Sequence, residues 1–287
     1  MSLTSSAVLV DLSIGVWTAR KLDKRVSEEV DVMKGTTVRA GNYSKNLLAG
    51  SVLLDRITKF AGSVRTWHGQ QTLPWSDMGT RLLPTRNFME YKTGINERET
   101  EFKRLVGEFI AEYPNLVNSA VMRLGGMCDL SEYPAVDTLT NKFKFAIEFC
   151  PLAQAGDFRI DAENDTREEL EAQYAKNLQA KEEVAMRELW TEMHEMLSHL
   201  SERLTDAKDE DGDVKHKQFR SNIIDNVLDR CSVLTKLNIT NDPKLEQARQ
   251  NLERILCDTH VDTIRESHEA RNSVKSKVDE ILNKMEW

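Results

Sequence analysis

The chain has 287 residues, of which 40% are hydrophobic and 30% charged, a balance typical of a globular protein with much exposed helical surface. Aromatic residues make up 7%, which argues against a large all-β core, and no apolar run is long enough to span a membrane. Residues 1–105 carry 16 Lys/Arg and 11 Asp/Glu, a net charge of +5, which leaves -13 on the rest of a chain whose total is -8. These features predict a cytoplasmic protein with one basic and one acidic part.

Two segments alternate apolar residues with a period of two, as strands with one buried face do. They are residues 7–17 and residues 142–150, and Pro151 ends the second because proline cannot donate to a β-ladder. A two-stranded ribbon is marginal without cover, so we expect the segments to pair antiparallel beneath helices. The residues expected to face those helices are Leu12, Ile14, Phe145 and Ile147.

Between these strands, apolar residues recur at steps of three and four, which predicts helices. Gly35 and Pro114 supply helix ends, and residues 68–86 form a loop rich in turn residues. The expected helices cover residues 18–34, 42–66, 87–113 and 114–124.

The C-terminal part has longer amphipathic patterns. We expect helices over residues 165–207, 215–237 and 243–287, with an acidic break at 206–213 after the first. Their narrow apolar stripes predict a coiled-coil-like hairpin or bundle. Candidate assembly residues on the first stripe are Leu178, Leu189 and Leu200.

These patterns together predict a mainly α protein with a small β element, an α+β fold. A two-stranded antiparallel ribbon covered by helices is expected in a head domain, residues 1–160. Long amphipathic helices are expected in residues 161–287.

The sequence offers no arrangement that indicates a catalytic site, a cofactor or a metal. His194 and His199 are five residues apart, which points their rings away from each other on a helix. Gly125-Gly126 lacks the Lys-Ser/Thr of a phosphate-binding loop. The four cysteines form no CxxC pair, so reduced, buried thiols are expected.

Residues 36–86 form a basic segment, with seven Lys/Arg against two Asp. Cations follow phosphates and exposed aromatic rings stack on unpaired bases, so the segment is a candidate for single-stranded nucleic-acid binding. In the alternative interpretation, the tryptophans anchor the loop to the core and the arginines are solvated or paired. The candidate residues are Arg56, Lys59, Arg65, Trp67, Trp75, Arg81 and Arg86.

Four separated blocks resemble an uncharacterised family of bacteriophages, prophages and integrative elements. They are LVDLSIGVWTARKL, TLPWSDMGTRLLPTRNFMEY, EFIAEYPNLV and FKFAIEFCPL, and the resemblance covers roughly residues 7–155. It implies no catalytic residues. It does imply a AAA+ ATPase of the MoxR type as a possible partner, because members of that family are often encoded beside one.

Two functions follow as hypotheses. The first is a non-enzymatic phage or mobile-element accessory protein, in the host cytoplasm, that assembles with its own copies as a homo-oligomer or with a AAA+ ATPase. The second is an accessory protein that binds single-stranded nucleic acid through residues 36–86. An enzyme of unknown type is a third reading, which the sequence disfavours because it offers no site.

Overall fold

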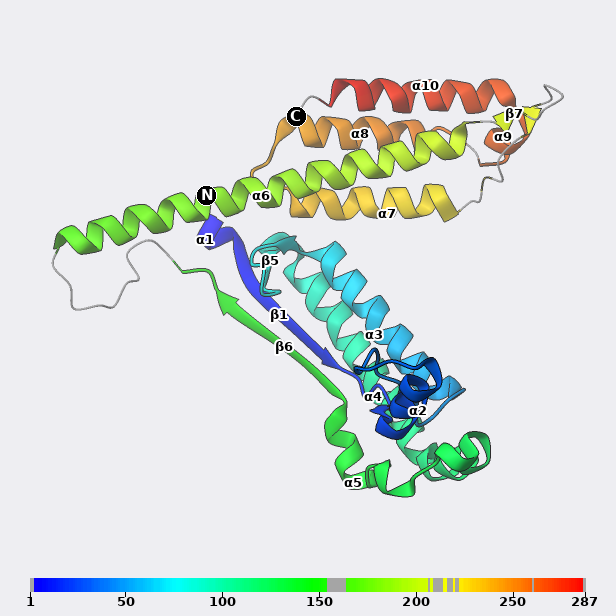
Figure 1. The fold of residues 1–287 in the computed structure, drawn as a ribbon. Helices are drawn as coiled ribbons and strands as arrows, with labels where there is room; N and C mark the ends of the chain where they lie inside the picture. Colours follow the sequence, from blue (N-terminus) through cyan, green and yellow to red (C-terminus); the bar gives the residue numbers. More distant parts are fainter. Residues whose placement is uncertain are drawn as a thin grey trace. The chain divides into compact units, whose positions relative to one another are not determined.

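The structure, a computed structural model, is mainly helical with small antiparallel sheets (Figure 1), which confirms the predicted α+β class. The residues it describes are 3–153, 164–205, 207–208, 214–215, 219, 222–259 and 261–285.

The main sheet has four strands in the order β4-β5-β1-β6. Its strands are β1 (Ala7–Gly15), β4 (Leu73–Pro74), β5 (Arg81–Pro84) and β6 (Lys144–Pro151). β1 and β6 are neighbours and run in opposite directions (Figure 1), so the predicted pairing is confirmed.

The expectation of only two strands is wrong. β5, from the segment predicted as a loop, pairs antiparallel with the other edge of β1, and β4 pairs with β5. Three consecutive residues of β5 are buried, which explains why the segment forms a strand. Pairing with β1 lets it bury its apolar side chains while its backbone N–H and C=O groups form hydrogen bonds.

Of the four residues expected to face helices, Ile14 and Phe145 pack against a helical core, and the Phe145 and Phe102 ring centroids are 5.5 Å apart. Leu12 and Ile147 are half-buried.

The helix predicted from residue 18 begins later, because a short ribbon of β2 (Arg20–Leu22) and β3 (Ser44–Asn46) comes first. α2 (Lys24–Lys34) starts where the Asp23 carboxylate accepts a hydrogen bond from the Val26 amide. It ends as predicted at Gly35, whose φ of 66° belongs to the left-handed region that glycine tolerates.

α3 (Val52–Gln71) forms where a helix over 42–66 was predicted. α4 (Thr85–Leu124) is one continuous helix where two were predicted, over 87–113 and 114–124. The predicted break at Pro114 is therefore wrong. A proline inside a helix costs about 3 kcal/mol, yet Tyr113 before it and Ala120 after it are buried in one core. Packing on both sides of Pro114 offsets that cost. Short helical turns are α1 (Leu3–Ser6), η1 (Gly125–Met127), η2 (Leu130–Glu132), α5 (Val136–Leu139) and η3 (Thr140–Lys142).

The C-terminal helices pack side by side (Figure 1). α6 (Asn164–Leu204) agrees with its prediction and α7 (Asn222–Leu237) ends where expected. The prediction of one helix over residues 243–287 is wrong. This segment forms three helices, which are α8 (Pro243–Cys257), α9 (Val261–Glu266) and α10 (His268–Lys284). The division lets α10 turn back and pack against both α6 and α8, which buries its apolar stripe. The acidic break at 206–213 lies mostly outside the described residues, apart from β7 (Ala207–Lys208), which pairs with β8 (Val214–Lys215).

The chain divides into two compact units. The bundle unit consists of Met1–Asp11, Gly69–Tyr91 and Phe149–Trp287, and the head unit consists of Leu12–His68 and Lys92–Glu148. Each unit has its own buried apolar cluster. These units do not coincide with a division at residue 160, because the chain passes between them several times, within β1, α3, α4 and β6.

Candidate protein-binding groove

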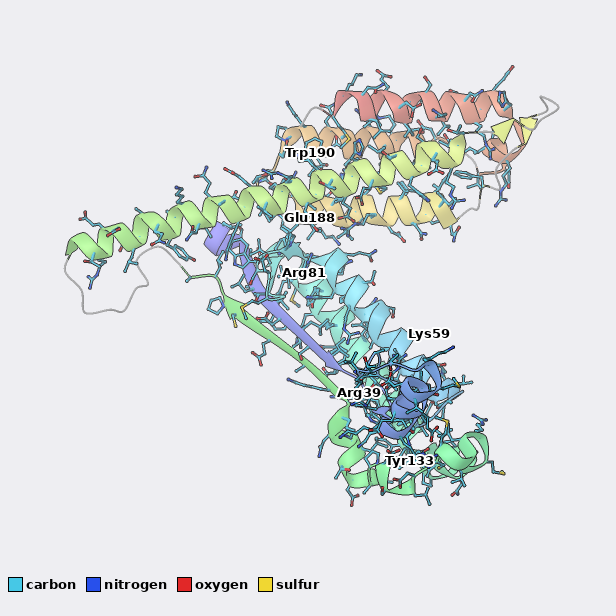
Figure 2. All side chains as sticks on the ribbon, in the orientation of Figure 1. Arg39, Lys59, Arg81, Tyr133, Glu188 and Trp190 are labelled. Carbon is cyan, nitrogen blue, oxygen red and sulfur yellow. The ribbon has the colours of Figure 1, made fainter. Side chains whose placement is uncertain are left out.

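A groove of about 650 Å³ lies between α8 and α10 of the bundle unit, and α6 contributes Trp190 to it. Figure 2 labels Trp190 on α6 beside α8. Three apolar side chains of the groove are buried and two are half-buried. These five form the floor: Trp190, Ala248, Ile255, Ile281 and Met285.

One carboxylate orients the tryptophan. Asp242 is the N-cap of α8, and its Oδ1 accepts hydrogen bonds from the amides of Lys244 and Leu245. Its Oδ2 accepts a hydrogen bond from Trp190 Nε1 at 3.0 Å. The Asn238 side chain in turn bonds both the amide and the carbonyl of Asp242. The turn between α7 and α8 therefore caps a helix and holds the indole at the groove.

We expect Asp242→Ala to lower the stability of the bundle unit by about 0.5–2 kcal/mol, because it removes the helix cap. Asp242→Asn should lose less stability, since asparagine caps equally well, but its amide NH2 cannot accept the hydrogen bond from Trp190 Nε1. Thermal unfolding followed by circular dichroism measures the difference. A loss of the same size in both variants would show that the carboxylate's second oxygen, which accepts from Trp190 Nε1, matters more than the cap.

The rim of the groove is basic. Its charged residues are the cations Lys244, Arg254, Lys277 and Lys284 and the anions Asp258 and Glu280. The excess of two positive charges stands out in a part of the chain whose net charge is negative. An apolar floor with a basic rim suits an apolar ligand that carries negative charge along its edges.

The three predicted assembly residues differ in burial. Leu189 and Leu200, each 1% exposed, belong to the core of the bundle unit itself, whereas Leu178 is half-buried at its margin. The groove lies elsewhere, and sequence reasoning missed it. The sequence signal that could have indicated the groove is a row of charged, polar and apolar residues on one face of α8. The row proceeds at steps of three and four, from Lys244 through Ala248 and Asn251 to Ile255.

Several cations of the basic segment have protein partners. In the head unit, Lys45 is 6% exposed and lies 2.7 Å from Glu132 and 3.4 Å from Asp23. Arg56 pairs with Glu108, and Arg65 donates to the Ile14 carbonyl at 2.7 Å.

In the bundle unit, Arg81 donates to the Thr72 hydroxyl and carbonyl and to the Gly69 carbonyl, and burial lowers its pKa. Lys59 and Arg86 are exposed. The candidate cations are thus divided between the two units.

Both candidate tryptophans pack against protein groups. Trp75 is 9% exposed in the bundle core. Trp67 is half-buried in the head unit, where the Arg98 guanidinium lies 3.8 Å from its ring centroid. Binding of single-stranded nucleic acid by residues 36–86 stays a prediction, and retention of a labelled oligonucleotide on a filter at low salt tests it.

Trp67 also packs on the backbone of α4. A methyl group added at Gly94 would lie 2.7 Å from Trp67 Cζ2, so we expect Gly94→Ala to cause strain of about 1–3 kcal/mol. Gly107, also in α4, has open space around it, so Gly107→Ala should raise stability by about 1 kcal/mol. Melting temperatures of the two variants should move in opposite directions. A rise in both would mean that the ring moves aside freely.

The cysteines only partly match expectation. All four are free, but Cys150 and Cys257 are exposed and Cys128 is half-buried, whereas buried thiols were expected. Cys231 is buried, and burial raises its pKa to about 11. Among the described residues, no group of three or more His, Cys, Asp or Glu is placed to hold a metal ion. In the same part of the chain, no helix is long and apolar enough to cross a membrane.

Comparisons with known proteins add no assignment. No protein-family model matches the chain, and the searches of curated proteins and of solved structures find no match either.

Proposed function

We propose that the protein acts without catalysis, by binding another protein in the groove between α8 and α10. The observation that supports this most is the combination of an apolar floor with a basic rim on one face of a helical bundle. Such a surface is the form that helix-in-groove recognition takes.

The shape favours a peptide over a small molecule. Lining residues follow α8 from Lys244 to Asp258, which is about 21 Å at 1.5 Å per residue. A ligand that contacts this whole length needs apolar groups repeated about once per helical turn. An amphipathic helix has that repeat, and acidic residues along its edges would meet the rim cations.

Site-specific photocrosslinking tests the proposal. A photoreactive amino acid at Asn251, which lines the groove, should give a protein adduct in the cell of origin. The control position is Glu195, an exposed residue of α6 outside the groove lining. Adducts at Asn251 and not at Glu195 support the proposal, and equal yields or none at Asn251 would reject it.

The wider role is proposed on the resemblance to the phage and mobile-element family. In that role the groove serves an accessory protein that assembles in the host cell, and a AAA+ ATPase is one partner that the crosslinking would identify by mass spectrometry.

A further inference from the structure

We propose that the groove accepts a second copy of this chain, through residues 166–184 at the start of α6. The inference rests on the proposed function and names its partner. Three properties of that helical segment support it: its exposure, its charge and its length.

The first property is the exposure of the side chains in residues 166–184. Every side chain from Thr166 to Val184 is exposed or half-buried, whereas Ala185 and Leu189 begin the buried stripe of the same helix. Val184 is 51% exposed. Leu178 packs at the margin of the bundle core and the Lys181 ammonium lies 5.1 Å from the Trp75 ring centroid, but no side chain of these five turns is fully buried. Most of a helix's stability in a protein comes from packing of its apolar face, so the segment keeps apolar surface that a partner can cover.

The second property is the charge of the segment, which is opposite to that of the groove. Residues 166–184 contain five Glu and three Lys/Arg, a net charge of -2, against an excess of two positive charges on the groove. Glu168, Glu169 and Glu171 are concentrated near the start of the segment. The acidic edge that the groove calls for is therefore present in the chain itself.

The third property is the length of the segment, together with the spacing of its apolar side chains. The segment is about 27 Å long at 1.5 Å per residue, enough to occupy a groove of about 21 Å. Leu170 and Tyr174, one turn apart, are half-buried. The Tyr174 hydroxyl donates to the Ala153 carbonyl at 2.6 Å, and the Leu170 side chain and the Tyr174 ring supply apolar groups for the floor. Each copy has one groove and one such segment, so a reciprocal exchange closes as a two-fold dimer.

A complementary charge swap tests the pairing. The groove variant is Lys244→Glu with Lys277→Glu, and the helix variant is Glu168→Lys with Glu171→Lys. Each variant alone places like charges together, so its dimer dissociation constant should rise about tenfold or more. In an equimolar mixture both grooves meet helices of opposite charge, so heterodimers should form again. Sedimentation velocity of the full chain measures the states, and circular dichroism checks that each variant is folded.

The expected result is a wild-type dimer, two weakened variants and a restored mixture. A monomeric wild type, variants that dimerise as tightly as wild type, or a mixture that stays monomeric would overturn the inference. The inference can fail while the proposed function stands: if Asn251 still crosslinks to a different protein, the groove binds a partner other than this chain. If Asn251 gives no adduct, both fail.

Discussion

Lys45→Ala should lower the free energy of unfolding of the head unit by about 3–5 kcal/mol, because it leaves buried charge without a partner. The Lys45 ammonium lies 2.7 Å from Glu132 and 3.4 Å from Asp23, and it donates to the Met127 carbonyl at 2.9 Å. It joins β3, the start of α2 and η2. Whole domains are stable by only about 5–15 kcal/mol, so a large fraction of Lys45→Ala molecules should have an unfolded head unit at moderate urea concentrations. Urea titration followed by circular dichroism measures that fraction.

The matched control removes the Lys45 charge together with that of the nearer carboxylate, Glu132. Lys45→Met with Glu132→Gln should cost clearly less than Lys45→Ala, because Glu132 is no longer left charged without its cation and Asp23 keeps its hydrogen bond from the Val26 amide. If Lys45→Ala changes the unfolding midpoint no more than this double variant does, the ion pair is not what holds the three elements together.

The same cluster sets an expected pH dependence. The pKa of Lys45 is raised, first by its hydrogen bond with Glu132. A raised folded-state pKa means that the stabilisation is complete below the unfolded-state pKa of about 10.4 and is lost as pH rises through the folded-state value. The stability difference between wild type and Lys45→Met with Glu132→Gln should therefore stay constant near neutral pH and decrease in strong alkali, where Lys45 loses its proton. A change centred near pH 7 would contradict this assignment.

Leu189→Ala should lower the stability of the bundle unit by about 2–5 kcal/mol, the range for a buried leucine replaced by alanine. Leu189 is 1% exposed in a cluster shared by α6, α7, α8 and α10, so the truncation leaves a cavity that several helices line. Leu178→Ala is the matched control in the same helix, where a half-buried side chain loses less contact. Thermal unfolding of both variants measures the difference.

This pair also separates folding from assembly. If Leu189 served an interface between copies, its truncation would weaken the dimer and leave the folded monomer as stable as before. Because its side chain is buried within one chain, we expect the reverse order, with unfolding affected first. Equal melting temperatures for wild type and Leu189→Ala would contradict the burial of the Leu189 side chain.

The sequence by itself determined the elements whose signal is local. Period-two alternation identified β1 and β6, apolar steps of three and four identified α6, and Gly35 marked the end of α2. Each of these depends on residues within a few turns or one strand of each other. The pairing of β1 with β6 followed because two strands with one apolar face each need a common cover.

The tertiary structure alone decided the features that depend on distant neighbours. β5 became a strand because an edge of β1 was open to it, and α4 continued through Pro114 because one core packs both sides of the proline. The sequence places Lys45 in the basic segment 36–86, and only the tertiary structure shows that two carboxylates distant in sequence from each other enclose it. The groove also depends on tertiary packing, because its floor and rim come from three helices. The apolar pattern of one helix does not predict where a space remains between it and its neighbours.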